Sequence, residues 1–177
     1  MEHPFHKFDD PSQKVLVVAT NRAYKNGDLY IGAEHILLGL LTIEKDSVAY
    51  KILSRFKFNM EPMDEIPKRP IFENMAGFQP NEAVRRIIHY VMQWRDTFGD
   101  KTTGTEHLLL ALAQERSGIS AKILEKAEID LEKVHAEVEK IRGQTLPFTP
   151  IYKAENLFAD IMKEEKNAKT NLDKEVS

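Results

Sequence analysis

The sequence predicts an all-α protein built from two similar helical units. The first observation is a repeated motif, since GAEHILLGLL at residues 32–41 returns as GTEHLLLALA at residues 104–113. The second is the helical spacing of apolar residues on both sides of each copy of the motif. The third is composition: 177 residues, 42% of them hydrophobic, suffice for one domain with a sizeable core or for two small lobes that share an interface.

The similarity between the two copies extends beyond the motif. Glu34 and Glu106 are separated by 72 positions, and the same offset aligns the turn NGD at residues 26–28 with FGD at residues 98–100. Downstream, the similarity continues through residues 119–134 of the second copy, with an offset one residue shorter. Self-similarity at a fixed period is typical of a repeated supersecondary unit, so we expect two pseudo-symmetric repeats.

The first repeat is expected to contain four helices. Apolar residues at 15–23 follow an amphipathic spacing and a glycine supplies a stop, so the first helix should cover about residues 12–26. The second, at about residues 34–43, is apolar on nearly every face and should be buried at the centre of its repeat. The third spans about residues 47–56, and Asn59 can cap a fourth through its side-chain oxygen.

The segment after the first repeat reads as a connector. Three prolines within residues 62–70 cannot continue a regular helix, so the fourth helix of the first copy should be cut short. In the second copy the helical pattern continues to Gly143, and an apolar stripe at residues 157–162 predicts one more helix before a disordered charged end from about Lys166. The predicted parts are repeat 1 at residues 8–66, an inter-repeat linker at 67–78, repeat 2 at 79–142 and a C-terminal extension at 143–177.

Composition and missing motifs exclude several classes of function. The longest apolar runs, residues 15–19 and 108–113, are far shorter than the roughly 20 residues of a membrane span. The amino-terminal residues lack a secretory-signal pattern and the chain has no cysteine, so we expect a cytoplasmic protein. A net charge of −3 argues against nucleic acid as a partner. GxxxxGK[ST], GxGxxG and GxSxG are all missing, so we expect neither an enzyme nor a bound cofactor.

The Glu and His of each motif admit more than one interpretation. Neighbouring helical residues point about 100° apart, so Glu34 and His35 are not expected to face one metal ion together, unlike the pair of an HExxH helix. His35 and His107 are expected to pack near the start of the buried helix, each with one ring nitrogen hydrogen-bonded, and Thr105 is expected to cap the second of these helices. Glu34 and Glu106 lie in the first helical turn, where a carboxylate complements the helix dipole by about 0.3 to 1 kcal/mol. That structural role does not require Glu in both copies, so both carboxylates are also candidate ligand contacts.

Residues 8–142 resemble the double-repeat N-terminal domain of the Clp-type AAA+ unfoldases, particularly ClpA and ClpC. The resemblance rests on FDDPSQKVLVVATNRA at the first helix, on IGAEHILLGLL and TGTEHLLLALA at the two repeat cores, and on SAKILEKAEIDLEKV in the second repeat. It implies an all-α fold of two pseudo-symmetric four-helix repeats packed together. It also implies that such a domain recruits substrates or adaptor proteins to a Clp protease, without chemistry of its own.

In ClpC-like members, the Glu of each EH motif belongs to a pocket that recognises phosphoarginine, and the matching positions here are Glu34 and Glu106. A carboxylate can hold a guanidinium through paired charge-assisted hydrogen bonds, and a helix N-terminus can hold the phosphate. The chain departs from the family at the start of the first helix, where Asp9 and Asp10 replace a frequent threonine and should weaken phosphate binding. It departs again at Ala33, which also stands in place of a threonine.

The resemblance leads to three hypotheses of function. The unfoldases join this domain to two ATPase modules, whereas no P-loop follows here, so we expect a stand-alone copy or a piece excised from an unfoldase. The first hypothesis is a non-enzymatic module that binds a Clp-family AAA+ unfoldase, its protein substrates or its adaptors. The alternative is a stand-alone decoy that sequesters a small molecule or peptide independently of the protease. A metal-dependent hydrolase that uses the EH pairs is the third hypothesis and has the least support.

Overall fold

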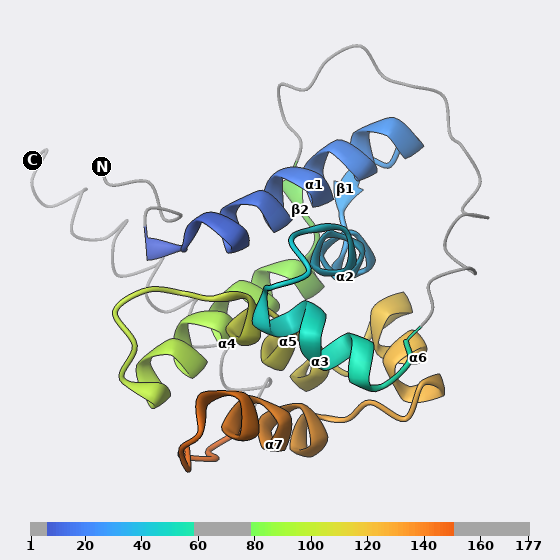
Figure 1. Ribbon diagram of the computed structural model, residues 1–177. Helices are drawn as coiled ribbons and strands as arrows, with labels where there is room; N and C mark the ends of the chain where they lie inside the picture. The colour runs from blue at the N-terminus through green and yellow to red at the C-terminus, as the bar shows by residue number, and fades with distance from the viewer. Residues whose placement is uncertain (1–6, 59–78, 151–177) are drawn as a thin grey trace, which may run out of the picture. The chain divides into compact units, whose positions relative to one another are not determined.

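The computed structural model describes residues 7–58 and 79–150, and within these ranges the chain forms seven α-helices and two short strands (Figure 1). The elements are α1 (Asp10–Asn26), β1 (Tyr30–Ile31), α2 (Ala33–Thr42), α3 (Val48–Arg55), β2 (Gln79–Pro80), α4 (Glu82–Phe98), α5 (Thr105–Gln114), α6 (Gly118–Lys126) and α7 (Leu131–Arg142). The predicted all-α class is confirmed. The first three helices begin and end within two residues of their predicted bounds.

The chain divides into two units, residues 1–147 and 148–177, and the helices above all belong to the first. Several predicted features lie outside the described residues. They are the fourth helix of repeat 1 after Asn59, the linker at 67–78, the helix at 157–162 and the charged end from Lys166. These features, and the predicted domain bounds, stay predictions.

The helices of the two repeats pack in matching ways. The first helix of each repeat packs on the second, α1 on α2 and α4 on α5, and the two second helices contact each other. Each third helix crosses to the other repeat, since α3 contacts α5 and α6 contacts α2. This reciprocal packing is the arrangement expected of two pseudo-symmetric repeats that share one interface.

The first helices of the two repeats begin and end alike. Asp9 and Asn81 are their N-caps, and each side-chain oxygen accepts the backbone N–H three residues ahead at 2.9 Å. Gly27 and Gly99 end these helices with φ of 72°, a left-handed conformation that residues with a Cβ rarely adopt. The predicted glycine stop is therefore correct, and it fixes where the following turn begins.

The segments that precede the helices pair between the repeats. β1 and β2 are parallel, with Ile31 opposite Pro80, and Phe8 forms a parallel bridge with Thr103 at the matching place. The N-cap residue of α1 donates its backbone N–H to the Thr103 carbonyl at 2.9 Å, and that of α4 donates to the Ile31 carbonyl at 3.1 Å. The start of α1 therefore lies beside the segment that leads into α5, and the start of α4 lies beside the segment that leads into α2.

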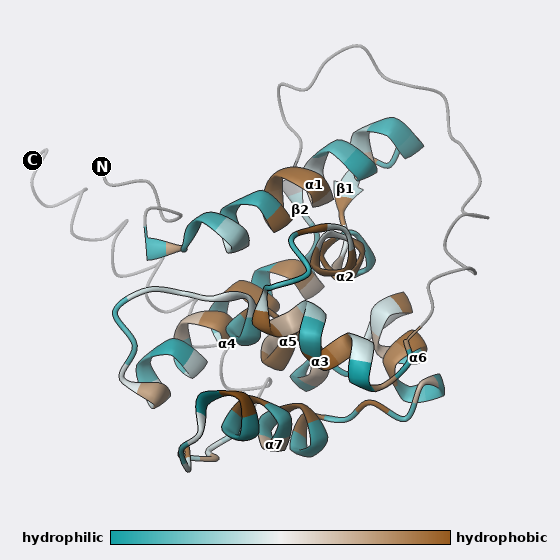
Figure 2. Cartoon of the chain, viewed as in Figure 1, coloured by the Kyte–Doolittle hydropathy of each residue, from teal (hydrophilic) through white to brown (hydrophobic). Residues whose placement is uncertain are grey.

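The core is centred on α2 and α5. Ile36, Leu37 and Leu40 of α2 are fully buried, as is the run 108–112 of α5, so the prediction of buried second helices is confirmed. α1 carries hydrophobic residues in its middle and hydrophilic ones toward both ends (Figure 2). In the described part of the chain, none of the helices has the length and apolar character needed to cross a membrane.

Thr105 does not have the role that the sequence predicted for it. The N-cap of α5 is Gly104, and Thr105 is the first helical residue. Its Oγ1 instead accepts a hydrogen bond from the backbone N–H of Ala49 at 3.2 Å, in a buried contact. Ala49 lies in the first turn of α3, where the backbone N–H groups have no partner within the helix. The prediction was wrong because the hydroxyl caps a helix of the other repeat.

Candidate functional site

The two EH motifs form two separate sites, one at the start of α2 and one at the start of α5. We call them the repeat-1 site, made of Asp28, Gly32, Glu34 and His35, and the repeat-2 site, made of Asp100, Gly104, Glu106 and His107. The Asp of each site belongs to the turn that follows α1 or α4, because its backbone N–H still bonds a carbonyl of that helix. Both glutamates lie in the first turn of their helix, as predicted. Their participation in binding stays a prediction.

Each histidine is held through both ring nitrogens. His35 Nδ1 accepts the backbone N–H of Gly32 at 2.9 Å, and its Nε2 lies 3.1 Å from Asp28 Oδ2. The matching distances in the repeat-2 site are 2.8 and 2.9 Å. Because Nδ1 accepts, the proton of the neutral ring sits on Nε2 and is donated to the carboxylate. The predicted packing role is thus correct, whereas the prediction of one bonded nitrogen per ring is wrong.

The glycine before each motif makes room for a carboxylate. A Cβ at Gly32 would overlap the Glu34 carboxylate, and a Cβ at Gly104 would overlap that of Glu106. Each glutamate side chain therefore folds back over the glycine that caps its helix, close to the histidine. In both repeats, the glycine thus leaves space for the glutamate carboxylate and donates its backbone N–H to the histidine.

The repeat-2 site contains a cation that comes from α7. Arg142, the last residue of this helix, places Nη2 2.7 Å from Asp100 Oδ2 and 2.5 Å from Glu106 Oε1. The guanidinium carbon lies 5.1 Å from the centre of the Phe98 ring. The side chains of Arg142 and Glu106 are only 17% and 11% exposed. Two carboxylates and an aromatic face are the groups that hold a guanidinium most strongly in proteins.

Burial and charge together set the protonation states in the repeat-2 site. Burial lowers the pKa of His107, and the negative charges of Glu106 and Asp100 oppose this only in part. Burial raises the pKa of Asp100, but the hydrogen bond and charge of Arg142 outweigh it and hold that pKa below its usual value. Burial also lowers the pKa of Arg142, but the hydrogen bonds to both carboxylates outweigh this effect. The pKa of Arg142 therefore lies above its usual value. At neutral pH the site contains a neutral imidazole, an ionised Asp100 and a charged guanidinium.

The same residues have the proximity of metal ligands, which the sequence argument had not foreseen. One ligand atom each of Asp100, Glu106 and His107 lies within 4.8 Å of the others. The helical-angle argument missed this because the glutamate folds back and the aspartate comes from the preceding turn. The carboxylates nevertheless bond the guanidinium of Arg142, and both nitrogens of His107 are bonded to other groups. The arrangement therefore fits an organic cation better than a metal ion.

The repeat-1 site has the same frame but a different surrounding. Within residues 7–58 and 79–150, no lysine or arginine pairs with Asp28 or Glu34. Their side chains are 18% and 19% exposed. The residue that matches Phe98 at the 72-residue offset is Asn26, so this position does not supply an aromatic ring. The described part of the chain thus presents two carboxylates here with no lysine or arginine paired to them.

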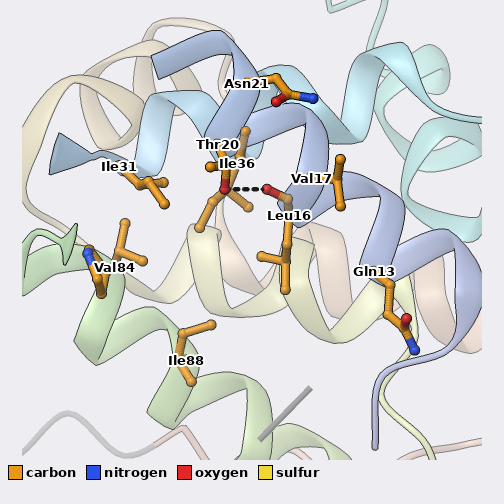
Figure 3. A pocket seen from close by; sticks show the side chains of 11 residues that line it. Gln13, Leu16, Val17, Thr20, Asn21, Ile31, Ile36, Val84 and Ile88 are labelled. Carbon is orange, nitrogen blue, oxygen red and sulfur yellow. Dashed lines mark hydrogen bonds between the residues drawn. The ribbon is translucent and has the colours of Figure 1, made fainter. Parts of the chain in front are cut away.

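A third feature is an apolar groove between α1 and α4, with a volume of about 570 Å³ (Figure 3). Leu16 comes from α1, Ile31 from β1, and Val84 and Ile88 from α4, and their side chains surround the same opening. Val17 of α1 also lines the groove and is 58% exposed. The remaining lining residues are Gln13, Ala19, Thr20, Asn21, Ile36 and Pro80.

The sequence analysis did not predict this groove. The sequence contained one signal for the groove. Leu16 and Val17 are apolar although they lie outside the buried side of α1, to which Val15 and Ala19 belong. Only the fold, which brings residues of α1, β1 and α4 around one opening, shows that the extra apolar residues line it.

The family-level comparison covers most of the chain. The model of the family described as "Clp repeat (R) N-terminal domain" matches residues 7–69 and 79–150. The ClpA homolog of Guillardia theta, named an ATP-dependent Clp protease ATP-binding subunit, is 31% identical over 146 residues, which are 80% of this chain and 18% of that protein. ClpC/MecB of Bacillus subtilis, named a negative regulator of genetic competence, is 30% identical over 142 residues, or 78% of this chain and 17% of that protein. The chain thus spans less than a fifth of the length of these relatives.

Solved structures agree on the fold. The Hsp104 N-terminal domain from Candida albicans superposes with a TM-score of 0.64 at 16% identity, covering 80% of this chain and 95% of that one. The N-domain of ClpV from Vibrio cholerae has a TM-score of 0.64 at 14% identity, covering 80% of this chain and 89% of that one. The two EH motifs, the reciprocal helix packing and the family match together define the class of the protein, a double-repeat helical N-domain. The chain belongs to the Clp repeat N-terminal domain family.

Proposed function

We propose that the chain is a non-enzymatic protein-binding module of the Clp protease system, which recognises substrates or adaptors of a Clp-family unfoldase. Membership in the Clp repeat N-terminal domain family supports a role in binding, because several relatives are named as subunits of the Clp protease or as chaperones. The observation that carries the proposal is the open apolar groove between α1 and α4.

The chemistry of the groove suits an extended apolar segment of another protein. Its volume of about 570 Å³ lies within the range of ligand-binding pockets, roughly 300 to 1,000 Å³. Leu16, Val17 and Ile88 offer aliphatic surface, whose burial contributes about 25 cal/mol per Å². Asn21 at the margin carries an amide that can bond the backbone of a bound peptide. Segments of this kind are exposed when a substrate unfolds.

We further propose that the repeat-1 site holds an arginine side chain of the bound protein. The Asp28 and Glu34 carboxylates match the two acids that hold a guanidinium in the repeat-2 site, and they lack a partner cation within the described ranges. The adjoining start of α4 carries Glu82. A negative charge at the start of α4, which adjoins the segment leading into α2, disfavours a phosphate group there. We therefore propose unmodified arginine as a better ligand than phosphoarginine here.

The start of α1 bears on the same question at the repeat-2 site. Asp9 caps α1 with its side chain and Asp10 is the first residue of that helix. The backbone N–H of Asp9 bonds the Thr103 carbonyl, in the segment that leads to Glu106. Two negative charges near this segment support the expectation that phosphate binding is weakened here.

The groove can be tested by fluorescence anisotropy with labelled, permanently unfolded casein. Val17→Glu places a charge that must be desolvated on binding, so we expect affinity to fall by about tenfold or more. Ile119→Glu on α6 is the matched control, because Ile119 is 55% exposed and does not line the groove. Equal binding by Val17→Glu and wild type would remove the groove from the proposal.

Co-purification with a Clp unfoldase separates this function from the decoy alternative, which predicts ligand binding without contact to the unfoldase.

A further inference from the structure

The two EH sites share a frame that does not depend on Arg142. The bonds from histidine to glycine and to aspartate have nearly the same lengths in both, 2.9 and 3.1 Å in the repeat-1 site and 2.8 and 2.9 Å in the repeat-2 site. In both, the glutamate carboxylate folds over the capping glycine. Because the repeat-1 site forms this frame without a partner cation in the described ranges, the guanidinium of Arg142 is an addition to a preformed site.

The position of Arg142 is that of a tethered ligand. It comes from the end of α7, outside the helix pair α4 and α5 that builds the site, and Gly143 ends the helix immediately after it. Its Nη2 bonds both carboxylates, and its guanidinium lies over Phe98. A ligand attached to the same chain has a high effective concentration at its site, on the order of millimolar, so a free ligand must compete with it.

We propose that Arg142 is a built-in guanidinium ligand that closes the repeat-2 site to arginine side chains of other proteins. The two EH sites are then unequal in function, and Arg142 determines which of them accepts an external arginine. This rests on the proposed function, in which the repeat-1 carboxylates recognise a guanidinium from another protein.

The test uses two backbone amides as reporters in ¹H–¹⁵N NMR spectra. Gly32 and Gly104 each donate their N–H to the histidine of their site, directly beneath the glutamate carboxylate. The probe is N-acetyl-arginine amide, with N-acetyl-lysine amide as the control ligand that lacks a guanidinium. In the wild-type protein, we expect arginine amide to shift the Gly32 signal and leave that of Gly104 unchanged.

Removal of the tethered ligand should open the second site. In Arg142→Ala and in Arg142→Gln, the Gly104 signal should respond to arginine amide, with an apparent dissociation constant at least about tenfold lower than in wild type. The dispersion of the spectra shows whether each variant keeps its fold. Two variants are used because Gln keeps more of the packing of the arginine stem than Ala does.

The possible results separate the two proposals. An equal Gly104 response in wild type and both variants would overturn the closure by Arg142. A Gly104 signal that stays fixed in folded variants would overturn it too, because the repeat-2 carboxylates would then not bind an external guanidinium. A Gly32 signal that stays fixed in every protein, while Gly104 responds only in the variants, would uphold the closure and contradict the arginine contact proposed for the repeat-1 site.

Discussion

The substitution Arg142→Met gives a direct energetic test of the guanidinium in the repeat-2 site. Methionine keeps a long apolar stem and a good helix propensity at the end of α7, so the main loss is the charged group. The change leaves Asp100 and Glu106 close together without their cation, because Arg142 Nη2 bonds both of them.

The expected magnitude follows from the contacts and their exposure. A hydrogen bond to a charged group contributes about 1.5 to 3 kcal/mol, and a cation over an aromatic ring about 0.5 to 1 kcal/mol at an exposed site. The side chain of Asp100 is 28% exposed, so water recovers part of the loss once the guanidinium is gone. We therefore expect the free energy of unfolding to fall by about 2 to 3 kcal/mol, somewhat less than when a fully buried pair is broken.

Urea denaturation measures this change, with the midpoint falling and the slope constant. Lys14→Met is the matched control, because Lys14 pairs with Glu44 on the surface, where the side chains are 58% and 56% exposed. Its free energy of unfolding should equal that of wild type within error. A loss in Arg142→Met no larger than in Lys14→Met would refute the reasoning, since the carboxylates would then not hold the guanidinium in solution.

Three further predictions concern the fold and its response to pH. Thr105→Val should lower the free energy of unfolding by about 1 to 2 kcal/mol, because it leaves the buried N–H of Ala49 without a partner, and thermal unfolding followed by circular dichroism measures it. Gly39→Ala should destabilise by about 1 to 2 kcal/mol in urea, although alanine favours a helix, because its Cβ would lie 2.7 Å from a backbone carbonyl oxygen of α1; a neutral or stabilising result would mean that α1 and α2 are less closely packed. The folded-state pKa of His107 lies below its unfolded value near 6.5, so its contribution to stability is complete above pH 6.5 and is lost as pH falls from there through the folded-state pKa. Unfolding free energies measured across this window should decline toward acid, and the decline should be smaller in His107→Gln.

Local features of the sequence were enough to predict the first three helices. The amphipathic spacing before Gly27 and the apolar run that follows Glu34 gave α1 and α2 to within two residues. Both predictions rest on the helical period of apolar residues, which can be read directly from the sequence. The recurrence of the EH motif 72 residues later, with Glu106 in the place of Glu34, located the two EH sites in the sequence.

Features that depend on tertiary packing could not be predicted in this way. Arg142 reaches Glu106 from another helix, 36 residues along the chain, and no periodic pattern links them. Thr105 caps α3 of the other repeat, and it was assigned to its own helix because only that helix was visible in the sequence. The groove is lined by residues of α1 and α4, one helix from each repeat. In all three cases the partner residues come from elements far apart in the sequence.

Site-specific crosslinking at position 17 tests the central claim of a protein-binding groove most directly. A photoreactive benzoylphenylalanine in place of Val17 would sit at the exposed edge of the groove, and the same residue in place of Ile119 is the control on α6. We predict that unfolded casein crosslinks at position 17, that unlabelled casein competes for it, and that position 119 gives little product. Equal crosslinking at the two positions, or none at position 17 while casein binds, would contradict the groove as the binding surface.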